Sequence, residues 1–209
     1  MGADPQRDFP LFPLPVVLLP TEVIPLHIFE ERYKTMVARV LEEEGEFGIV
    51  WVANDGLREI GCACVIAEVL ERLPDGRLNL VARGTRPFRI EARQEELAYP
   101  AGTVEFLEDE PEPPDADAAD TAHAAYAELV EQATDRTPDQ EEIGRMTAYE
   151  MAATVDFGLD AKQGLLDLRS EAARLALAAK LFRAALKRLD FVERAQARAR
   201  SNGRVRFPA

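Results

Sequence analysis

The sequence has few of the side chains that usually carry out chemistry. Its 209 residues include only two cysteines, two histidines and two serines, Ser170 and Ser201. Two cysteines exclude a disulfide-rich scaffold, and the scarcity of all three types argues against most nucleophilic and metal-dependent enzymes. The phosphate-binding patterns GxxxxGK[S/T] and GxGxxG do not occur, and the sequence indicates no cofactor.

Long apolar runs are also missing. The longest uncharged run near the start, Phe9–Thr21, has 13 residues and four prolines, whereas a membrane-spanning helix needs about 20 apolar residues. No signal-peptide pattern follows it. We therefore expect a cytoplasmic protein with reduced thiols and no membrane partner.

Positive charge is in short supply. The chain has 25 Lys and Arg against 38 Asp and Glu, a net charge of −13. Because nucleic-acid binding needs excess positive charge, this balance argues against nucleic acid as a partner. The C-terminal run from Lys180 to Arg206 is the exception, with nine basic residues against Asp190 and Glu193. We interpret it as a solvated helix face, with contact to phosphates or an acidic partner as the alternative.

In the first half of the chain, apolar residues recur with the period that is typical of β-strands. Apolar residues alternate with polar ones around Leu80 and Ile90, and the turn sequence at Pro74–Arg77 favours a strand before it. A single helix is predicted at Glu30–Glu44, ending at Gly45. Strands are expected at Phe47–Ala53, Ile60–Leu73, Leu78–Ala82, Phe88–Arg93 and Thr103–Leu107, after an extended Pro-rich segment at Phe9–Leu19.

In the second half of the chain, apolar residues recur with the period that is typical of α-helices. Eight acidic residues and three prolines in Glu105–Asp120 predict a linker, which we place at residues 111–120. The longest helix carries an apolar stripe at spacings of three and four residues, which is typical of packing against other helices. The stripe consists of Ala172, Leu175, Ala179, Phe182, Leu186 and Leu189. Helix starts are predicted at Thr121, at Thr137, at Asp160 and, for the longest helix, at Ser170. Strands followed by helices predict an α+β protein.

The few reactive side chains have simpler explanations than catalysis. Cys62 and Cys64 are two residues apart on a predicted strand, where small apolar thiols pack well, and other soft metal ligands are far away in sequence. His27 lies among apolar residues, which favours a structural role. Ser170 is best explained as a helix cap, and Ser201 lies in a basic tail, residues 201–209.

Several motifs resemble the N-terminal domain of Lon proteases. The opening segment FPLPVVLLP at Phe12–Pro20 and VIPLHIFEERY at Val23–Tyr33 look like the start of that domain. Later motifs follow in the family's order over roughly residues 9 to 195. They are EIGCA at Glu59–Ala63, RLPDGR at Arg72–Arg77, VARGTRPFRI at Val81–Ile90 and DAKQGLL at Asp160–Leu166.

The resemblance implies a PUA-like β-barrel with one inserted helix, followed by a helical bundle. We assign the barrel to residues 9–110 and the bundle to residues 121–200. In full-length Lon this domain helps to hold protein substrates, and the ATPase and Ser–Lys protease modules follow it. The sequence shows neither module, so the resemblance is to a stand-alone substrate-binding domain without enzymatic activity.

The expected function is therefore the binding of unfolded or partner polypeptides. The prolines of Phe9–Phe29 limit strand pairing, which predicts an open edge or groove there. Candidate contact residues are Phe29, Tyr33 and Phe88, each of which also fits a core position. The alternatives are RNA binding, since other PUA-like barrels bind RNA, and a role as accessory factor of a separate ATP-dependent protease. The sequence does not indicate an oligomeric state.

Overall fold

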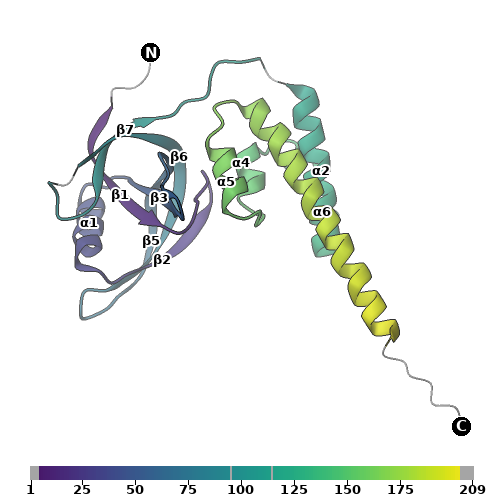
Figure 1. Cartoon of the computed structure of the whole chain (residues 1–209), viewed down its shortest axis with the longest axis horizontal. Helices are drawn as coiled ribbons and strands as arrows, with labels where there is room; N and C mark the ends of the chain where they lie inside the picture. Colours follow the sequence, from purple (N-terminus) through teal and green to yellow (C-terminus); the bar gives the residue numbers. More distant parts are fainter. Residues whose placement is uncertain (1–4, 95, 114, 203–209) are drawn as a thin grey trace, which may run out of the picture.

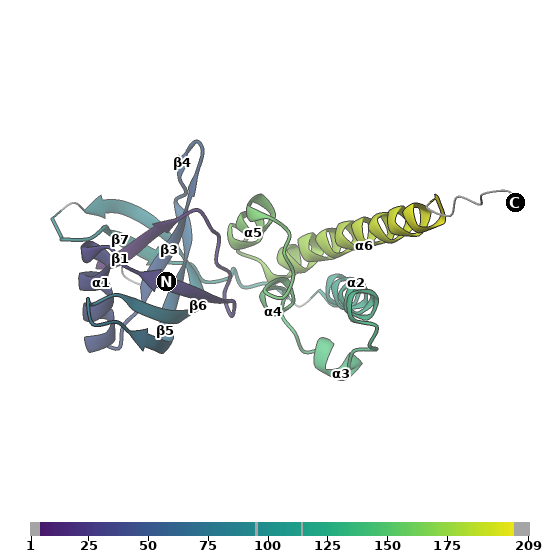
Figure 2. The ribbon, with the colours of Figure 1, turned by 90° about the horizontal axis from the view of Figure 1, so that it is seen from below.

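A computed structural model describes residues 5–94, 96–113 and 115–202 of the chain. A part made of strands is followed by a part made of helices, which confirms the α+β class (Figures 1 and 2). The first part contains β1 (Gln6–Leu14), β2 (Val23–Ile28), α1 (Glu31–Glu42), β3 (Phe47–Ala53), β4 (Gly56–Leu57), β5 (Ile60–Arg72), β6 (Leu78–Gln94) and β7 (Ala101–Phe106). The second contains α2 (Ala116–Thr134), α3 (Gln140–Ile143), α4 (Ala148–Ala152), α5 (Leu159–Leu166) and α6 (Glu171–Asn202).

Five of the strands form a closed ring. They follow one another in the order β1, β7, β6, β5 and β3, and a parallel pairing of β1 with β3 joins the two ends. That pairing places Leu11 opposite Gly48 and Leu14 opposite Trp51. Because β1 has a neighbour on each side, it is not the open edge that the prolines of Phe9–Phe29 predict.

β5 and β6 form one long hairpin. Its turn is the predicted one: Gly76 has a φ of 82°, and the N–H of Leu73 donates to the carbonyl of Arg77 at 2.9 Å. The strands predicted at Leu78–Ala82 and Phe88–Arg93 are a single strand, since residues 83–87 continue the pairing with β5. β2 pairs with β6 near the turn, on the opposite side from β5.

Apolar side chains are buried on both faces of the ring strands. On one face, a small cluster is built around Phe9, whose ring makes a T-shaped contact with that of Phe88, with 5.3 Å between ring centres. On the other face, a larger cluster runs from the strands to α1 and on into the helices. α1 contributes Tyr33, Met36, Val37 and Val40 to this cluster, as its sequence period predicts.

The helical part is built around α2 and α6, which lie side by side and run in the same direction (Figure 1). The Oγ of Ser170 accepts the N–H of Ala173 at 3.0 Å, which confirms Ser170 as the cap of α6. In the predicted stripe, Leu175, Ala179, Phe182 and Leu186 are buried. The end of α6 projects beyond the end of α2 (Figures 1 and 2).

The start of α2 differs from the prediction. The helix begins at Ala116, where the carboxylate of Asp115 accepts the N–H of Ala118 at 3.0 Å, and not at Thr121. The second half of the predicted linker, residues 111–120, is therefore helical. Acidic residues such as Asp117 favour a helix start because they interact with the exposed N–H groups of the first turn.

The helix predicted from Thr137 onward is in fact two short helices. Asp139, and not Thr137, caps α3, which ends at Gly144. Thr147 then caps α4 through a capping box with Glu150. The prediction for α5 was also wrong by two residues, because Gly158 precedes its first residue and Asp160 lies within its first turn.

Polar contacts join the helical part to the strands. Lys162 on α5 forms an ion pair with Glu22, and both side chains are largely buried. The side-chain amide of Gln163 donates to the carbonyl of Ile60 at 3.2 Å. These contacts hold α5 against the segment before β2 and the start of β5. Of the predicted basic tail, residues 203–209 lie outside the described part of the chain.

Candidate functional site

β2, β6 and β5 form a three-stranded sheet near the turn of the β5–β6 hairpin. Leu80, in the middle strand, lies between Leu26 on β2 and Val69 on β5. Leu26 and Leu80 are buried on the inner face, which belongs to the core. Alternation along β2 turns Val23, Pro25 and His27 to the other face, where all three are exposed.

A polar ladder crosses this outer face. His27 lies opposite Asn79, and Asn79 lies opposite Glu71. The amide nitrogen of Asn79 donates to Oε2 of Glu71 at 2.8 Å, so its oxygen accepts from Nδ1 of His27 at 2.6 Å. The His27 ring stacks on Phe29 with 5.8 Å between centres and 23° between planes. These hydrogen bonds therefore fix the imidazole ring of His27, and the ring of Phe29 stacks on it.

Large apolar side chains are exposed on the same region. Phe29, in the connection from β2 to α1, is 59% exposed, and Leu70 on β5 is 54% exposed. A shallow hollow of about 600 Å³ lies between β2 and the end of β5, and it is lined by Pro25, Leu26, His27, Leu70, Glu71, Asn79 and Leu80. Exposed apolar rings and methyl groups beside a hollow are typical of a protein-binding surface. We call the outer face of β2, β6 and β5, together with Phe29, the outer-sheet face.

β2 is also an edge strand. Within the part of the chain that the structure describes, its only strand partner is β6. Its other edge carries backbone groups available to a further strand, apart from Pro25, which has no N–H. An open edge therefore exists within Phe9–Phe29, but on β2 and not on β1.

The structure separates the three predicted contact residues. Phe29 presents its ring to solvent on the outer-sheet face. Tyr33 is buried, with its ring 4.2 Å from that of Phe12, and burial raises the pKa of its hydroxyl. Phe88 is fully buried against Phe9. Only Phe29 can contact a bound polypeptide without rearrangement of the core.

Sequence patterns did not point to His27 and Leu70 as parts of one surface. His27 has apolar neighbours in sequence because the strand alternates, while its own side chain faces outward. Leu70 lies at an irregularity in the pairing, between Val69 and Glu71, which interrupts the alternation of β5. The run of three apolar residues from Val65 onward gave no sign of where that irregularity falls.

The reactive side chains occupy structural positions. Cys62 and Cys64 are completely buried, and burial raises the pKa of both thiols. The thiol of Cys64 donates to the carbonyl of Phe47 at 3.2 Å. Ser170 donates to Glu112 at 2.7 Å while it caps α6, and Ser201 lies in the last turn of that helix. A buried protonated thiol is a poor nucleophile.

Two further features are absent from the described ranges, residues 5–94, 96–113 and 115–202. No helix there is long and apolar enough to cross a membrane. No three His, Cys, Asp or Glu side chains come together there in a group that could hold a metal ion.

Comparisons with known proteins agree on one relationship. The family model for the ATP-dependent protease La (LON) substrate-binding domain matches residues 8–183. The crystal structure of a Lon N-terminal domain protein from Xanthomonas campestris has a TM-score of 0.62 and 24% identity, covering 81% of this chain and 95% of that chain. The N-terminal domain of a Mycobacterium avium complex Lon protease has a TM-score of 0.61 and 22% identity, covering 84% and 98%.

The two solved structures show that the fold is that of Lon N-terminal domains, and the family match spans the ring of strands and the helices up to the first half of α6. The motifs from Phe12 to Leu166 lie within the matched range. The chain therefore belongs to the family of Lon substrate-binding domains.

Proposed function

We propose that this protein is a non-catalytic polypeptide-binding module that holds unfolded or partner proteins on its outer-sheet face. The observation that carries the proposal is Phe29, a large ring that is mostly exposed and is held in place by stacking on His27. Membership of a family of substrate-binding domains supports it.

Two kinds of contact are available to a bound chain. Apolar side chains of the polypeptide pack on Phe29 and on Leu70 beside the hollow. An extended segment also pairs with the free edge of β2, where main-chain hydrogen bonds are independent of sequence. Such a combination suits a module that binds many different unfolded chains, because neither contact demands a particular sequence.

The proposal assigns no bond cleavage to this chain. Both thiols are buried, and the Oγ of Ser170 is engaged in capping α6. We place the protein in the cytoplasm.

A binding assay with a permanently unfolded probe tests the function. The probe is a reduced, carboxymethylated and fluorescently labelled polypeptide, and its anisotropy is measured against increasing concentrations of the full chain. The variant Phe29→Ser should weaken binding about tenfold, since it removes the burial of one large ring. The matched control is Phe191→Ser, which removes a ring on α6 that is also mostly exposed (68%).

The outcomes separate the proposal from its alternatives. Saturable binding that Phe29→Ser weakens and Phe191→Ser leaves unchanged supports the outer-sheet face. Equal effects of the two variants, or affinity no greater than that of an inert globular protein, contradict it. Apolar docking persists at high salt, whereas RNA binding through phosphates weakens steeply.

A further inference from the structure

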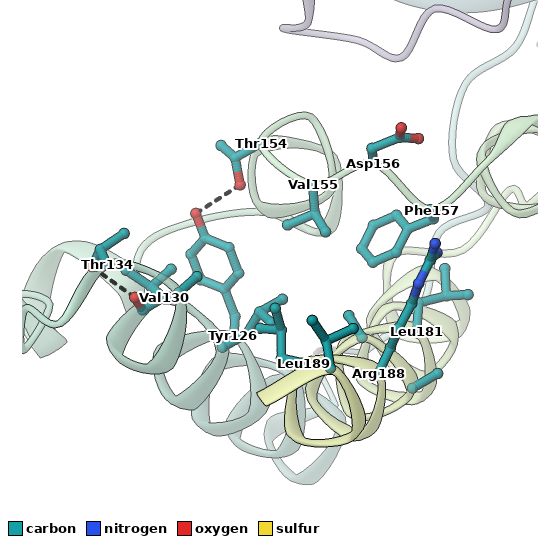
Figure 3. Close-up of a pocket in the computed structure, with 15 residues that line it drawn as sticks. Tyr126, Val130, Thr134, Thr154, Val155, Asp156, Phe157, Leu181, Arg188 and Leu189 are labelled. Carbon is teal, nitrogen blue, oxygen red and sulfur yellow. Dashed lines mark hydrogen bonds between the residues drawn. The ribbon is translucent and has the colours of Figure 1, made fainter. Parts of the chain in front are cut away.

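A second hollow lies in the helical part, far from the outer-sheet face. It is a groove of about 700 Å³ between α2, α6 and the connection from α4 to α5 (Figure 3). Val155 and Phe157, from the connection, form its upper wall, and Leu189 on α6 and Val130 on α2 form its sides. Most of the lining is apolar, so water in the groove is readily displaced by an apolar ligand.

The two long walls of the groove have helical spacing. On α6 the lining residues Leu181, Ala185, Arg188 and Val192 recur at intervals of four, three and four. On α2 the lining residues include Tyr126 and Ala133, two turns apart. Two neighbouring helices with such seams leave a groove of the shape that a third helix fills.

The groove is preformed. The hydroxyl groups of Tyr126 and Thr154 are hydrogen-bonded at 2.9 Å across its upper end. The amide of Gln132 donates to Asp190 at 2.7 Å, which ties the end of α2 to α6. Because both ends are fixed, a ligand does not have to order the walls.

One positively charged side chain lies along the groove. Arg188 lines it and extends along it beside Phe157 (Figure 3). The guanidinium of Arg188 has no ion pair or hydrogen bond within the residues that the structure describes. Asp156 is the other charged lining residue, but it points away, and its carboxylate accepts the N–H of Gly158 at 3.0 Å. Arg188 is therefore the charged side chain that extends along the groove, whereas the carboxylate of Asp156 points away from it.

We propose that this groove binds an acidic amphipathic helix of a partner protein. Apolar side chains of that helix, spaced by three and four residues, fill the groove, and a Glu or Asp carboxylate pairs with Arg188. A second copy of this chain is a different occupant, which the test below distinguishes. The proposal goes beyond the binding of unfolded chains and uses no residue of the outer-sheet face.

Two synthetic peptides test the proposal. The first, of about 18 residues or five helical turns, has Leu at intervals of four and three and Glu at the flanking positions. The second has Lys in place of every Glu. Binding of each labelled peptide to the full chain is measured by anisotropy, with Arg188→Glu as the test variant. Lys187→Glu is the matched control, because it makes the same change of charge at an exposed neighbour that does not line the groove.

The acidic peptide should bind saturably, and Arg188→Glu should weaken its binding at least about tenfold through like-charge repulsion. Lys187→Glu should have less than about a third of that effect, since exposed charges are screened. The basic peptide should bind the Arg188→Glu variant more tightly than the unchanged protein. Phe29→Ser should leave both affinities unchanged, which distinguishes this site from the outer-sheet face.

Three results would overturn the proposal. The first is equal loss of affinity in Arg188→Glu and Lys187→Glu, which would reflect net charge alone. The second is concentration-dependent self-association of the unchanged protein, measured by sedimentation, that Arg188→Glu abolishes, which would make a second copy the occupant. The third is Arg188-dependent binding of dodecanoate without binding of the acidic peptide, which would make the groove a site for small amphiphiles.

Discussion

The guanidinium of Arg174, near the start of α6, holds both carboxylate oxygens of Asp109, in the connection between the strands and the helices. One of the two hydrogen bonds measures 2.7 Å, and Arg174 also pairs with Glu171. Burial lowers the pKa of Arg174, but these carboxylates outweigh burial and raise the pKa above its ordinary value. The cation lies over the ring of Tyr149, 4.5 Å from its centre. This cluster around a buried cation connects α6 and α4 to the end of the strand region.

Replacing this cation should be costly. In Arg174→Met the carboxylates of Asp109 and Glu171 lose their partner but stay partly in contact with solvent, so the free energy of unfolding should fall by about 2–3 kcal/mol. Arg145→Met is the control, because it breaks an exposed pair with Glu141 and should cost less than about 1 kcal/mol. Urea unfolding of the two variants measures the difference. Equal losses would show that the Arg174 cluster contributes no more than a surface pair.

Gly84 should not tolerate a side chain. β6 passes so close to the segment before β2 that a Cβ at Gly84 would lie 2.2 Å from the carbonyl oxygen of Leu19. The two segments are hydrogen-bonded there, with the N–H of Gly84 donating to Glu22 at 2.9 Å. Gly84→Ala should therefore destabilise the protein by about 2–3 kcal/mol, because the backbone has to shift.

The control for this substitution is Gly164→Ala. Gly164 lies within α5, where an added Cβ would be 3.7 Å from Leu177, an ordinary contact. Alanine at this position should stabilise the helix by about 0.5–1 kcal/mol. Opposite shifts of the urea midpoint are expected for the two variants, and a stabilised Gly84→Ala would refute the close approach.

The two buried thiols should be unreactive in the folded protein. Their pKa values are raised by burial, so Cys62 and Cys64 stay protonated when the unfolded chain begins to ionise near pH 8.5. A thiol-specific disulfide reagent at about pH 8 should modify neither cysteine until guanidinium chloride unfolds the chain, and then both. Prompt reaction of the folded protein would show that the strand around Cys62 opens.

The same ionisation links stability to pH. Below about pH 8.5 the thiols are neutral in both states, and above it only the unfolded chain loses their protons. Each thiol should therefore lower the free energy of unfolding by up to about 1.4 kcal/mol per pH unit as pH rises. In a Cys62→Ala/Cys64→Ala variant the free energy of unfolding should decline less steeply from about pH 8.5 to pH 10. An identical decline in the variant and the unchanged protein would contradict the raised pKa of the thiols.

Regular periods made much of the fold predictable. The buried residues of α1 and the stripe from Leu175 to Leu186 follow from spacing alone, and the turn at Pro74–Arg77 follows from its residue types. Helix starts were less predictable. The acidic residues around Asp115 look like a linker in sequence, but in the structure they cap and precede α2. Whether such residues stay in solvent or cap a helix depends on how the segment that follows them packs against the rest of the protein.

The candidate surfaces were only partly visible in the sequence. Phe29 was a candidate because it follows an apolar strand, yet the same reasoning selected Tyr33 and Phe88, which are buried. Exposure depends on which face of the strand or helix meets the core. The groove beside Arg188 was not visible at all, because it forms between α2 and α6, whose residues are about 50 positions apart. The sequence showed basic residues along α6, but not that one of them lines an apolar hollow.

The way the ring of strands closes has a consequence for synthesis of the chain. Gln6, Phe9 and Pro10 of β1 pair with β7, more than 90 residues later. At ribosomal rates of roughly 5–20 residues per second, β1 waits on the order of ten seconds for this partner. Its second half gains β3 sooner through the parallel pairing. The first half of β1 therefore lacks its β7 partner until translation has passed Phe106.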